Sequence, residues 1–178
     1  MDELEYQIAI TMINGIGPVL ARNLVAYTGG ARELFQERKS ALAKIPGIGN
    51  ALIDEIKDKR VLEAAKYECD FVARNGIEPI YFTSTAYPRR LSNCEDAPLM
   101  LYKKGSCDLN SGKFLSVVGT RNITQDGTIL CEKLITELAY HHPDLVIVSG
   151  LAYGVDIVAH KVALSSGIHT IACLGHGL

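Results

Sequence analysis

The residues best placed to do chemistry lie in three glycine-rich segments of the last third of the chain. They are Gly119-Thr120-Arg121-Asn122, Ser149 to Asp156, and Gly175-His176-Gly177. Glycine lets a backbone approach an anion closely, and a helix N-terminus offers free N–H groups and the positive end of its dipole. Arg121 adds a fork of donors that suits phosphate. The three segments predict a site for an anionic, phosphate-bearing ligand.

Asp156 and His160 stand four positions apart, at the start of the helix expected after the second segment. An acid and an imidazole at this spacing can act as a pair in acid–base chemistry. The interpretation that we favour is structural: Asp156 caps the helix, and His160 bonds to the loop or to Asp156. Both residues are therefore given a supporting role, and no catalytic residue is predicted.

Missing motifs exclude several ligand classes. The chain has no G-x-G-x-x-G, and Ser149 stands where a dinucleotide site would need an acid. It has no G-x-x-x-x-G-K-[ST], and Ser149 is not the centre of a G-x-S-x-G. The five cysteines are widely spaced and form no C-x-x-C pair, which favours reduced thiols and a cytoplasmic location over disulfides or a structural metal.

The composition is that of an ordinary globular chain. Of its 178 residues, 48% are hydrophobic and 21% charged, and the formal net charge is -2. This composition is too apolar for disorder and leaves room only for a local basic patch. No apolar run approaches the roughly 18–20 residues that cross a bilayer. The acidic start MDELEYQIAI is neither a signal nor a transit peptide, so we expect no membrane association.

The segments just described lie between elements of a βαβαβ pattern. The expected strands are 114–118, 145–148 and 170–174, and the expected helices are 126–140 and 156–164. Strands without alternation, separated by helices, predict a parallel sheet covered on both faces, with its loops at one edge. In the first helix we expect four apolar residues to face inward: Ile129, Leu130, Leu134 and Leu138.

The chain before residue 76 is expected to be helical and contains an internal repeat. Residues 13–20, INGIGPVL, align with residues 45–52, IPGIGNAL, at a spacing of 32 positions. A Gly-Ile-Gly turn between helices leaves N–H groups free for a phosphate, although the glycines can equally serve only to make turns. Arg22 and Lys57 favour a phosphate here, whereas Asp54 and Glu55 oppose one. Two short strands, 79–82 and 99–102, should follow.

Several motifs of the sequence, together with the hairpin repeat, resemble those of the DprA/Smf DNA-processing family. The resemblance rests on Y-P-x-x-L at 87–91, P-L-M-L-Y-x-K-G at 98–105, V-G-T-R at 118–121, V-S-G-L-A-Y-G-V-D-x-x-A-H at 148–160, and L-G-H-G-L at 174–178. The hairpin repeat is similar to the paired helix-hairpin-helix, or SAM-like, domain of that family. The resemblance implies an α/β fold class: a helical domain over 1–75, then a partial Rossmann-like domain over 76–178.

The resemblance also implies a function. Family members bind incoming single-stranded DNA in natural transformation, protect it and load the RecA recombinase onto it, without enzymatic activity or a cofactor. They also form homodimers. Arg121 matches the arginine of the family's G-[ST]-R motif. The residues matching loops that shape the DNA pocket are Gly119, Ser149, Gly150 and Gly154.

Departures from the family pattern are few. Thr120 replaces a frequent serine, and Val155 replaces the usual isoleucine. The chain stops at Leu178, so we expect a fragment of a longer protein. An alternative from another class is a nucleotide phosphoribohydrolase that uses the same kind of pocket. It would need a carboxylate facing the ribose, and Asp156 is its candidate.

Overall fold

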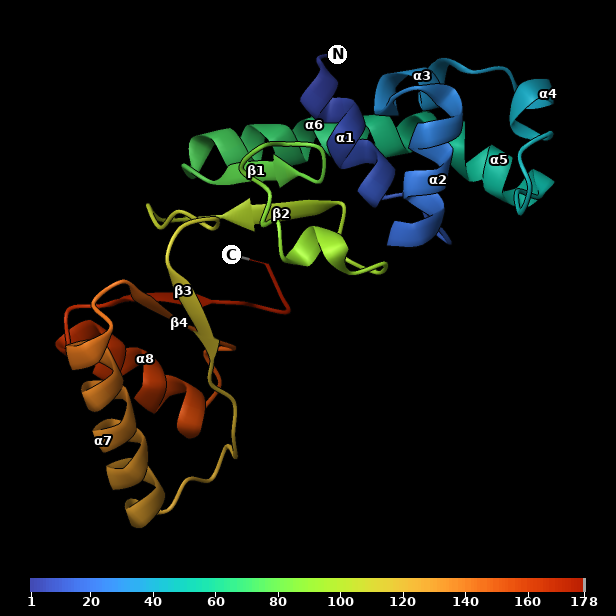
Figure 1. Cartoon of the computed structure of the whole chain (residues 1–178). Helices are drawn as coiled ribbons and strands as arrows, with labels where there is room; N and C mark the ends of the chain where they lie inside the picture. Colours follow the sequence, from blue (N-terminus) through green and yellow to red (C-terminus); the bar gives the residue numbers. More distant parts are fainter. Residues whose placement is uncertain (178) are drawn as a thin grey trace. The chain divides into compact units, whose positions relative to one another are not determined.

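The computed structural model describes residues 1–177 and divides into two compact units, Met1–Gly105 and Ser106–Leu178. Unit 1 contains six α-helices, a 3-10 turn and a two-stranded sheet (Figure 1). The helices are α1 (Glu3–Thr11), α2 (Pro18–Thr28), α3 (Ala31–Gln36), α4 (Lys39–Leu42), α5 (Asn50–Ile56) and α6 (Lys59–Arg74). They pack around fully buried side chains that include Ile8, Ile10, Leu24, Leu34, Leu42 and Ile56.

The internal repeat is present in the backbone as well as in the sequence. Gly15 and Gly47, at matching positions of the two copies, both adopt a left-handed conformation, with φ of 80° and 85°. Gly17 and Gly49 are the N-cap residues of α2 and α5. Because glycine alone adopts a left-handed φ without steric penalty, Gly15 and Gly47 explain why the same turn recurs. The expected helix-hairpin-helix pair is confirmed.

The two strands of unit 1 pack with its helices. β1 (Glu78–Tyr81) pairs antiparallel with β2 (Met100–Lys103), and η1 (Leu91–Asn93) lies between them. Tyr81 and Met100 are buried in the same cluster as the helix side chains. Because of this packing, unit 1 extends to Gly105, beyond the boundary expected after residue 75. The division into folding domains at that boundary stays a prediction.

Arg22 of α2 ties the connection between these strands to the helices. Its guanidinium donates to the carbonyls of Cys94, Glu95 and Ala97, at 3.3, 2.9 and 2.8 Å. Arg22 also lies over the ring of Phe82, 5.5 Å from its centroid. Tyr87, of the Y-P-x-x-L motif, also holds this segment in place, since this buried residue donates its hydroxyl to the carbonyl of Pro98 at 2.6 Å.

Unit 2 is the expected βαβαβ arrangement. Three parallel strands, in the order β3 (Lys113–Ser116), β4 (Leu145–Ser149) and β5 (His169–Ala172), alternate with α7 (Gln125–His141) and α8 (Val155–Ser165). Right-handed crossovers between sequential neighbours put both helices on one face, which differs from the expected cover on both faces. That face forms the core of unit 2, with Ile135, Ala139, Leu145, Ile147, Ala159 and Ala163 buried in it.

The expected inner face of α7 is wrong. Ile129, Leu130 and Leu134 are 55%, 68% and 51% exposed, and only Leu138 of the expected four packs on the core. The buried positions are Ile135 and Ala139 instead. Two apolar stripes overlap on this helix, and the one that contains Ile135 and Ala139 packs against α8 and the sheet.

In the part of the chain that is described, none of the helices combines the length and the apolar character that crossing a membrane would require.

Candidate nucleic-acid interface

The first two glycine-rich loops lie against each other at the carboxyl ends of β3 and β4. Gly154 has a φ of 83°, and a β-carbon there would overlap the carbonyl oxygen of Thr120 and lie 2.7 Å from the carbonyl carbon of Arg121. Val155 donates its N–H to the Thr120 carbonyl at 3.1 Å. A β-carbon on Gly119 would lie 2.8 Å from Cβ of Val155. Only glycine at 119 and 154 permits this close contact.

Asp156 holds the second loop in place. Its buried carboxylate accepts N–H groups from Gly150 at 3.2 Å and Ala152 at 3.4 Å. The expected cap on its own helix is wrong, because Gly154 is the N-cap of α8 and no side chain caps it. The N–H groups of Gly150 and Ala152 therefore serve the loop's own structure, and a phosphate would have to use other donors.

His160 is buried beneath the same loop. Its Nδ1 lies 2.6 Å from Oγ1 of Thr170, whose hydroxyl donates to the carbonyl of Ile147 at 3.0 Å. Since Thr170 gives its proton to Ile147, we assign the imidazole proton to Nδ1. The bond to Thr170 was not expected, and the backbone of Ser149, the first residue of the second loop, also acts on the imidazole. Burial lowers the pKa of His160, while the charge of Asp156 and the backbone of Ser149 act in the opposite direction.

Ser149 joins the strand ends. Its hydroxyl donates to the carbonyl of Val117 at 2.7 Å, and its own carbonyl accepts the N–H of Cys173 at 2.8 Å. Ser149, Asp156 and His160 are the buried polar or charged residues of the described chain, with exposed fractions of 6%, 6% and 4%. A polar layer therefore lies under the two loops and fixes their backbone.

Arg121 lies on the exposed side of this arrangement. Its side chain is exposed, and within residues 1–177 it takes part in no ion pair. The turn that carries it is held by a bond of 3.1 Å from the N–H of Asn122 to the hydroxyl of Thr120. Thr124 caps the following helix, α7, by accepting the N–H of Gly127. Among the described residues, Arg121 is thus an unpaired cation on a fixed backbone.

The third loop is not brought into the same contact. Gly175 and Gly177 are exposed, and an added β-carbon at either would meet no atom within 4 Å. His176 donates from Nδ1 to the carbonyl of Gly177 at 2.8 Å. The motif's last residue, Leu178, lies outside the described residues. Of the predicted site, the structure gathers Gly119, Thr120, Arg121, Ser149, Gly150 and Gly154, whereas Gly175 and Gly177 show no comparable close packing among residues 1–177.

The two cations singled out at the hairpins of unit 1 have partners within the fold, whereas Lys44, one position before the second hairpin, is exposed and in no ion pair of that unit. Arg22 is bound to three carbonyls, and Lys57 donates to the carbonyl of Phe35 at 2.6 Å, where burial lowers the pKa of its ammonium. The expectation that both cations favour a phosphate stays a prediction, and these bonds within the fold weigh against it.

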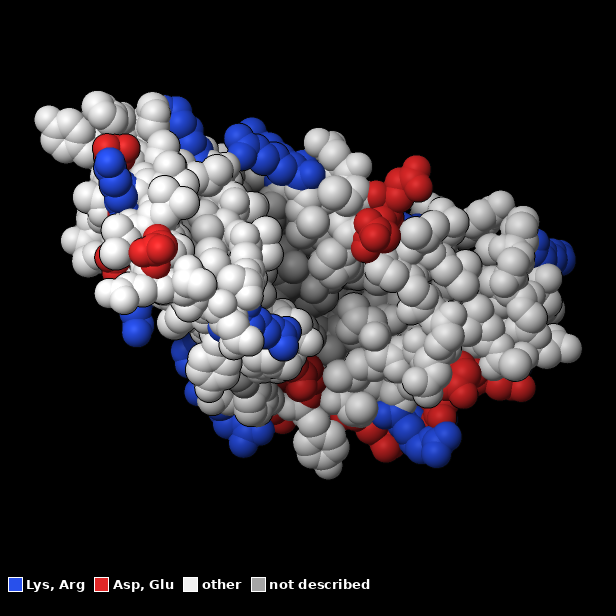
Figure 2. Space-filling view, turned by 90° about the horizontal axis from the view of Figure 1, so that it is seen from below, with Lys and Arg blue, Asp and Glu red and all other residues white. Residues whose placement is uncertain are grey.

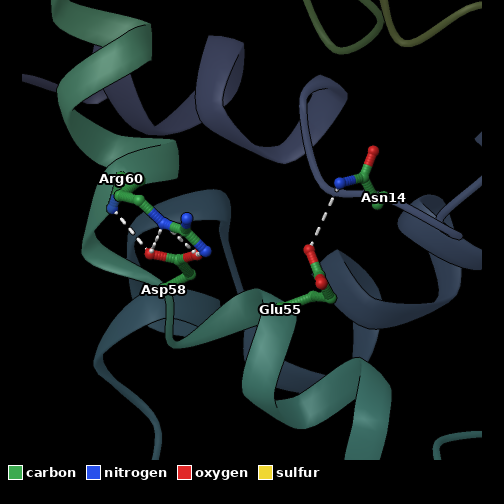
Figure 3. A network of polar contacts seen from close by, with 4 residues as sticks. All are labelled: Asn14, Glu55, Asp58 and Arg60. Carbon is green, nitrogen blue, oxygen red and sulfur yellow. Dashed lines mark hydrogen bonds and ion pairs between the residues drawn. The ribbon is translucent and has the colours of Figure 1, made fainter.

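Carboxylates also lie beside the first hairpin. Asn14 donates to Glu55 at 3.4 Å, and the neighbouring Asp58 accepts from Arg60 (Figure 3). These carboxylates oppose an anion at the turn. Figure 2 shows Lys and Arg side chains scattered among Asp and Glu side chains on the face that it displays.

Tyr153 was not predicted from the sequence as a site residue. It lies in the second loop and is 84% exposed, next to the glycine that contacts the Thr120–Arg121 backbone. Leu151 in the same loop is 46% exposed and has a φ of 58°. Among the described residues, it is the one residue other than glycine with a positive φ. An aromatic residue between two glycines after a buried strand was the signal available in the sequence.

A parallel sheet with glycine-rich loops at the carboxyl ends of its strands places unit 2 in the class of Rossmann-like α/β proteins. The model of the DNA recombination-mediator protein A family matches residues 78–178, and the chain belongs to this family. The resemblance to DprA/Smf proteins is thereby confirmed.

Individual relatives agree with the family. The chain is 46% identical over 92 residues to the DNA processing protein DprA of Streptococcus pneumoniae, which covers 52% of this chain and 32% of that protein. It is 31% identical to protein Smf of Synechocystis sp., over 99% of this chain and 45% of the relative. The X-ray structure of DprA from Streptococcus pneumoniae superposes with a TM-score of 0.68 at 29% identity, covering 99% of this chain and 59% of that one. The chain spans less than half the length of these two curated relatives.

Proposed function

We propose that this chain belongs to a recombination mediator that binds single-stranded DNA through the loops at the carboxyl ends of β3 and β4. The observation that carries the proposal is Arg121: its guanidinium is exposed and unpaired among residues 1–177, on a turn whose backbone packs against the second loop. A phosphate of the DNA backbone is the ligand that such a donor fork suits. Thr120 and the glycines at 119, 150 and 154 shape the approach to it.

The family supports the remainder of the proposal. The whole protein would protect incoming single-stranded DNA in natural transformation, load the RecA recombinase onto it, act as a homodimer and work in the cytoplasm. It would need no cofactor, because binding a phosphodiester chain in a positive pocket breaks no covalent bond. Gly175 and Gly177 would complete the pocket from the third loop.

A phosphoribohydrolase is less well supported. That reaction needs a carboxylate that is free to face a ribose carbon. Asp156 is only 6% exposed, and its carboxylate already accepts two backbone N–H groups. Incubation with nucleoside monophosphates tests this alternative. Release of free base that Asp156→Asn abolishes would establish the enzyme instead.

The variant Arg121→Ala tests the proposal for DNA. We expect its affinity for a single-stranded oligonucleotide to fall by about 10- to 150-fold, as for one charge-assisted phosphate contact of about 1.5–3 kcal/mol. The slope of log affinity against log salt should flatten by about 0.7. Lys133→Ala is the matched control, because Lys133 is an exposed cation of α7 in the same unit.

Gel shifts and fluorescence anisotropy at several salt concentrations measure both effects. A variant that binds as tightly as the wild type at low salt would remove Arg121 from the site. A wild-type chain that does not bind single-stranded oligonucleotides at all would contradict the proposed function.

A further inference from the structure

The second loop presents an aromatic ring to solvent on a backbone that is held from several sides. Tyr153 is 84% exposed, although a tyrosine ring would ordinarily bury much of its apolar surface. The residues around it are fixed: Asp156 binds the N–H groups of Gly150 and Ala152, and Gly154 packs against the backbone of Thr120 and Arg121. The ring is therefore offered by a rigid loop, so that little conformational freedom is lost when it binds a partner.

The conformation of the loop supports a role outside the core. Leu151 adopts a φ of 58°, which is unfavourable for a branched side chain, and it remains 46% exposed. Strain of this kind persists when surrounding bonds over-determine it, and it clusters where ligands are held. The carboxylate of Asp156 supplies those bonds, since it accepts the N–H groups of Gly150 and Ala152 on either side of Leu151.

The backbone that follows Tyr153 contacts the backbone of Arg121, the proposed phosphate contact. Gly154, the residue after Tyr153, touches the backbone of Arg121, so the ring and the guanidinium rise from adjoining segments of backbone. Sites for single-stranded nucleic acid combine cations that follow the phosphates with aromatic rings on which bases stack. The two side chains here supply one of each.

We infer that Tyr153 is a base-stacking residue: it binds the face of an unpaired nucleobase whose strand is held through phosphate by Arg121. This inference rests on the proposed function and adds to it the recognition of the base. It predicts a preference for single strands over duplex, because a paired and stacked base has no free face. It also predicts little dependence on base identity, since every base has a π-face.

Other exposed tyrosines provide the control. Tyr140 is 83% exposed in the last turn of α7, in the same unit, and its ring contacts His141. It matches Tyr153 in residue type and exposure and differs in lacking a glycine-rich loop around it. Tyr153→Ala and Tyr140→Ala therefore remove equal amounts of exposed ring from two different places.

The first experiment measures the affinity for a thymine oligonucleotide and for the same backbone carrying abasic sites. We expect Tyr153→Ala to weaken binding of the oligonucleotide by about 5- to 150-fold, as for one stacked base. Tyr153→Phe should restore it, and Tyr140→Ala should leave it unchanged. Binding of the abasic strand should be the same for Tyr153→Ala and wild type. The salt slope should also be unchanged, because no phosphate contact is lost.

The second experiment uses tryptophan as a reporter, because the chain contains none. In Tyr153→Trp the single indole should be quenched by a saturating thymine oligonucleotide, whereas in Tyr140→Trp it should not. If Arg121→Ala weakens binding while Tyr153→Ala binds normally and Tyr153→Trp is not quenched, the stacking inference is overturned and the proposed function stands. If the wild-type chain binds no oligonucleotide, the proposed function itself has failed. An equal loss on the abasic strand would also overturn stacking.

Discussion

The two Gly-Ile-Gly hairpins of unit 1 and the two packed glycine loops of unit 2 look alike in sequence, and the arginine or lysine singled out beside each differs in its partners. Both place glycines at the start of a helix, and both bring a basic residue near. At the hairpins, Arg22 and Lys57 already bind backbone carbonyls. At the loops of unit 2, Arg121 is exposed and unpaired among the described residues. Glycine spacing thus sets the shape of a turn, whereas the partners of the nearby cations decide whether a phosphate can use it.

The largest expected effect distinguishes the two sets of glycines. Gly154→Ala places a β-carbon against Thr120 and Arg121 at a φ of 83°, so we expect unit 2 to lose about 3 kcal/mol or more. Gly49→Ala, at an N-cap with no atom within 4 Å of the new β-carbon, should change stability by less than about 1 kcal/mol. Urea unfolding of both variants measures the difference. Equal losses would show that the loops of unit 2 are no more tightly packed than the hairpins.

Removing the cation of the hairpin region should affect stability and leave binding intact. In Arg22→Ala the carbonyls of Cys94, Glu95 and Ala97 lose their donor, and the free energy of unfolding of unit 1 should fall by about 2 kcal/mol. Affinity for single-stranded DNA should stay within about twofold under conditions where the variant is folded, because we assign this arginine no phosphate. A large loss of affinity in a folded Arg22→Ala would reverse the comparison of the two regions.

The smallest expected effect is one of pH and is confined to unit 2. All five histidines of the chain lie in that unit, and His160 is the buried one. Because burial lowers its pKa in the folded state, the unfolded chain takes up a proton more readily as the pH falls. The stabilisation is present above the ordinary pKa of about 6.5 and is lost as the pH falls toward the lower folded value.

Hydrogen exchange at pH 7.5 and 5.5, corrected for intrinsic rates, measures this effect in each unit. Protection in β4 and α8 should decrease at the lower pH relative to that in α1 and α6, and His160→Gln should reduce the difference. An equal decrease in both units would assign the acid sensitivity to groups other than His160.

Much of the fold could be predicted from the residues. The two hairpin repeats were found at the right positions because a left-handed turn at Gly15 and Gly47 requires glycine. The alternation of strands and helices after residue 113 was also predicted correctly, because continuous apolar strands of a parallel sheet need helices between them. The face of α7 was missed, since its two overlapping apolar stripes are distinguished only by what packs against them.

The sequence by itself determined the turns, the order of the elements and the gathering of Gly119 to Arg121 with Ser149 to Asp156 at one sheet edge. These follow from local backbone preferences and from the direction of parallel strands. The tertiary structure alone decided that Asp156 holds Gly150 and Ala152 and that Tyr153 is exposed. It also decided that Arg22 is bound to carbonyls, whereas Arg121 is unpaired among residues 1–177. The carbonyl partners of Arg22 lie 72 to 75 positions away in the sequence, so the availability of this cation to a ligand depends on packing that no local pattern encodes.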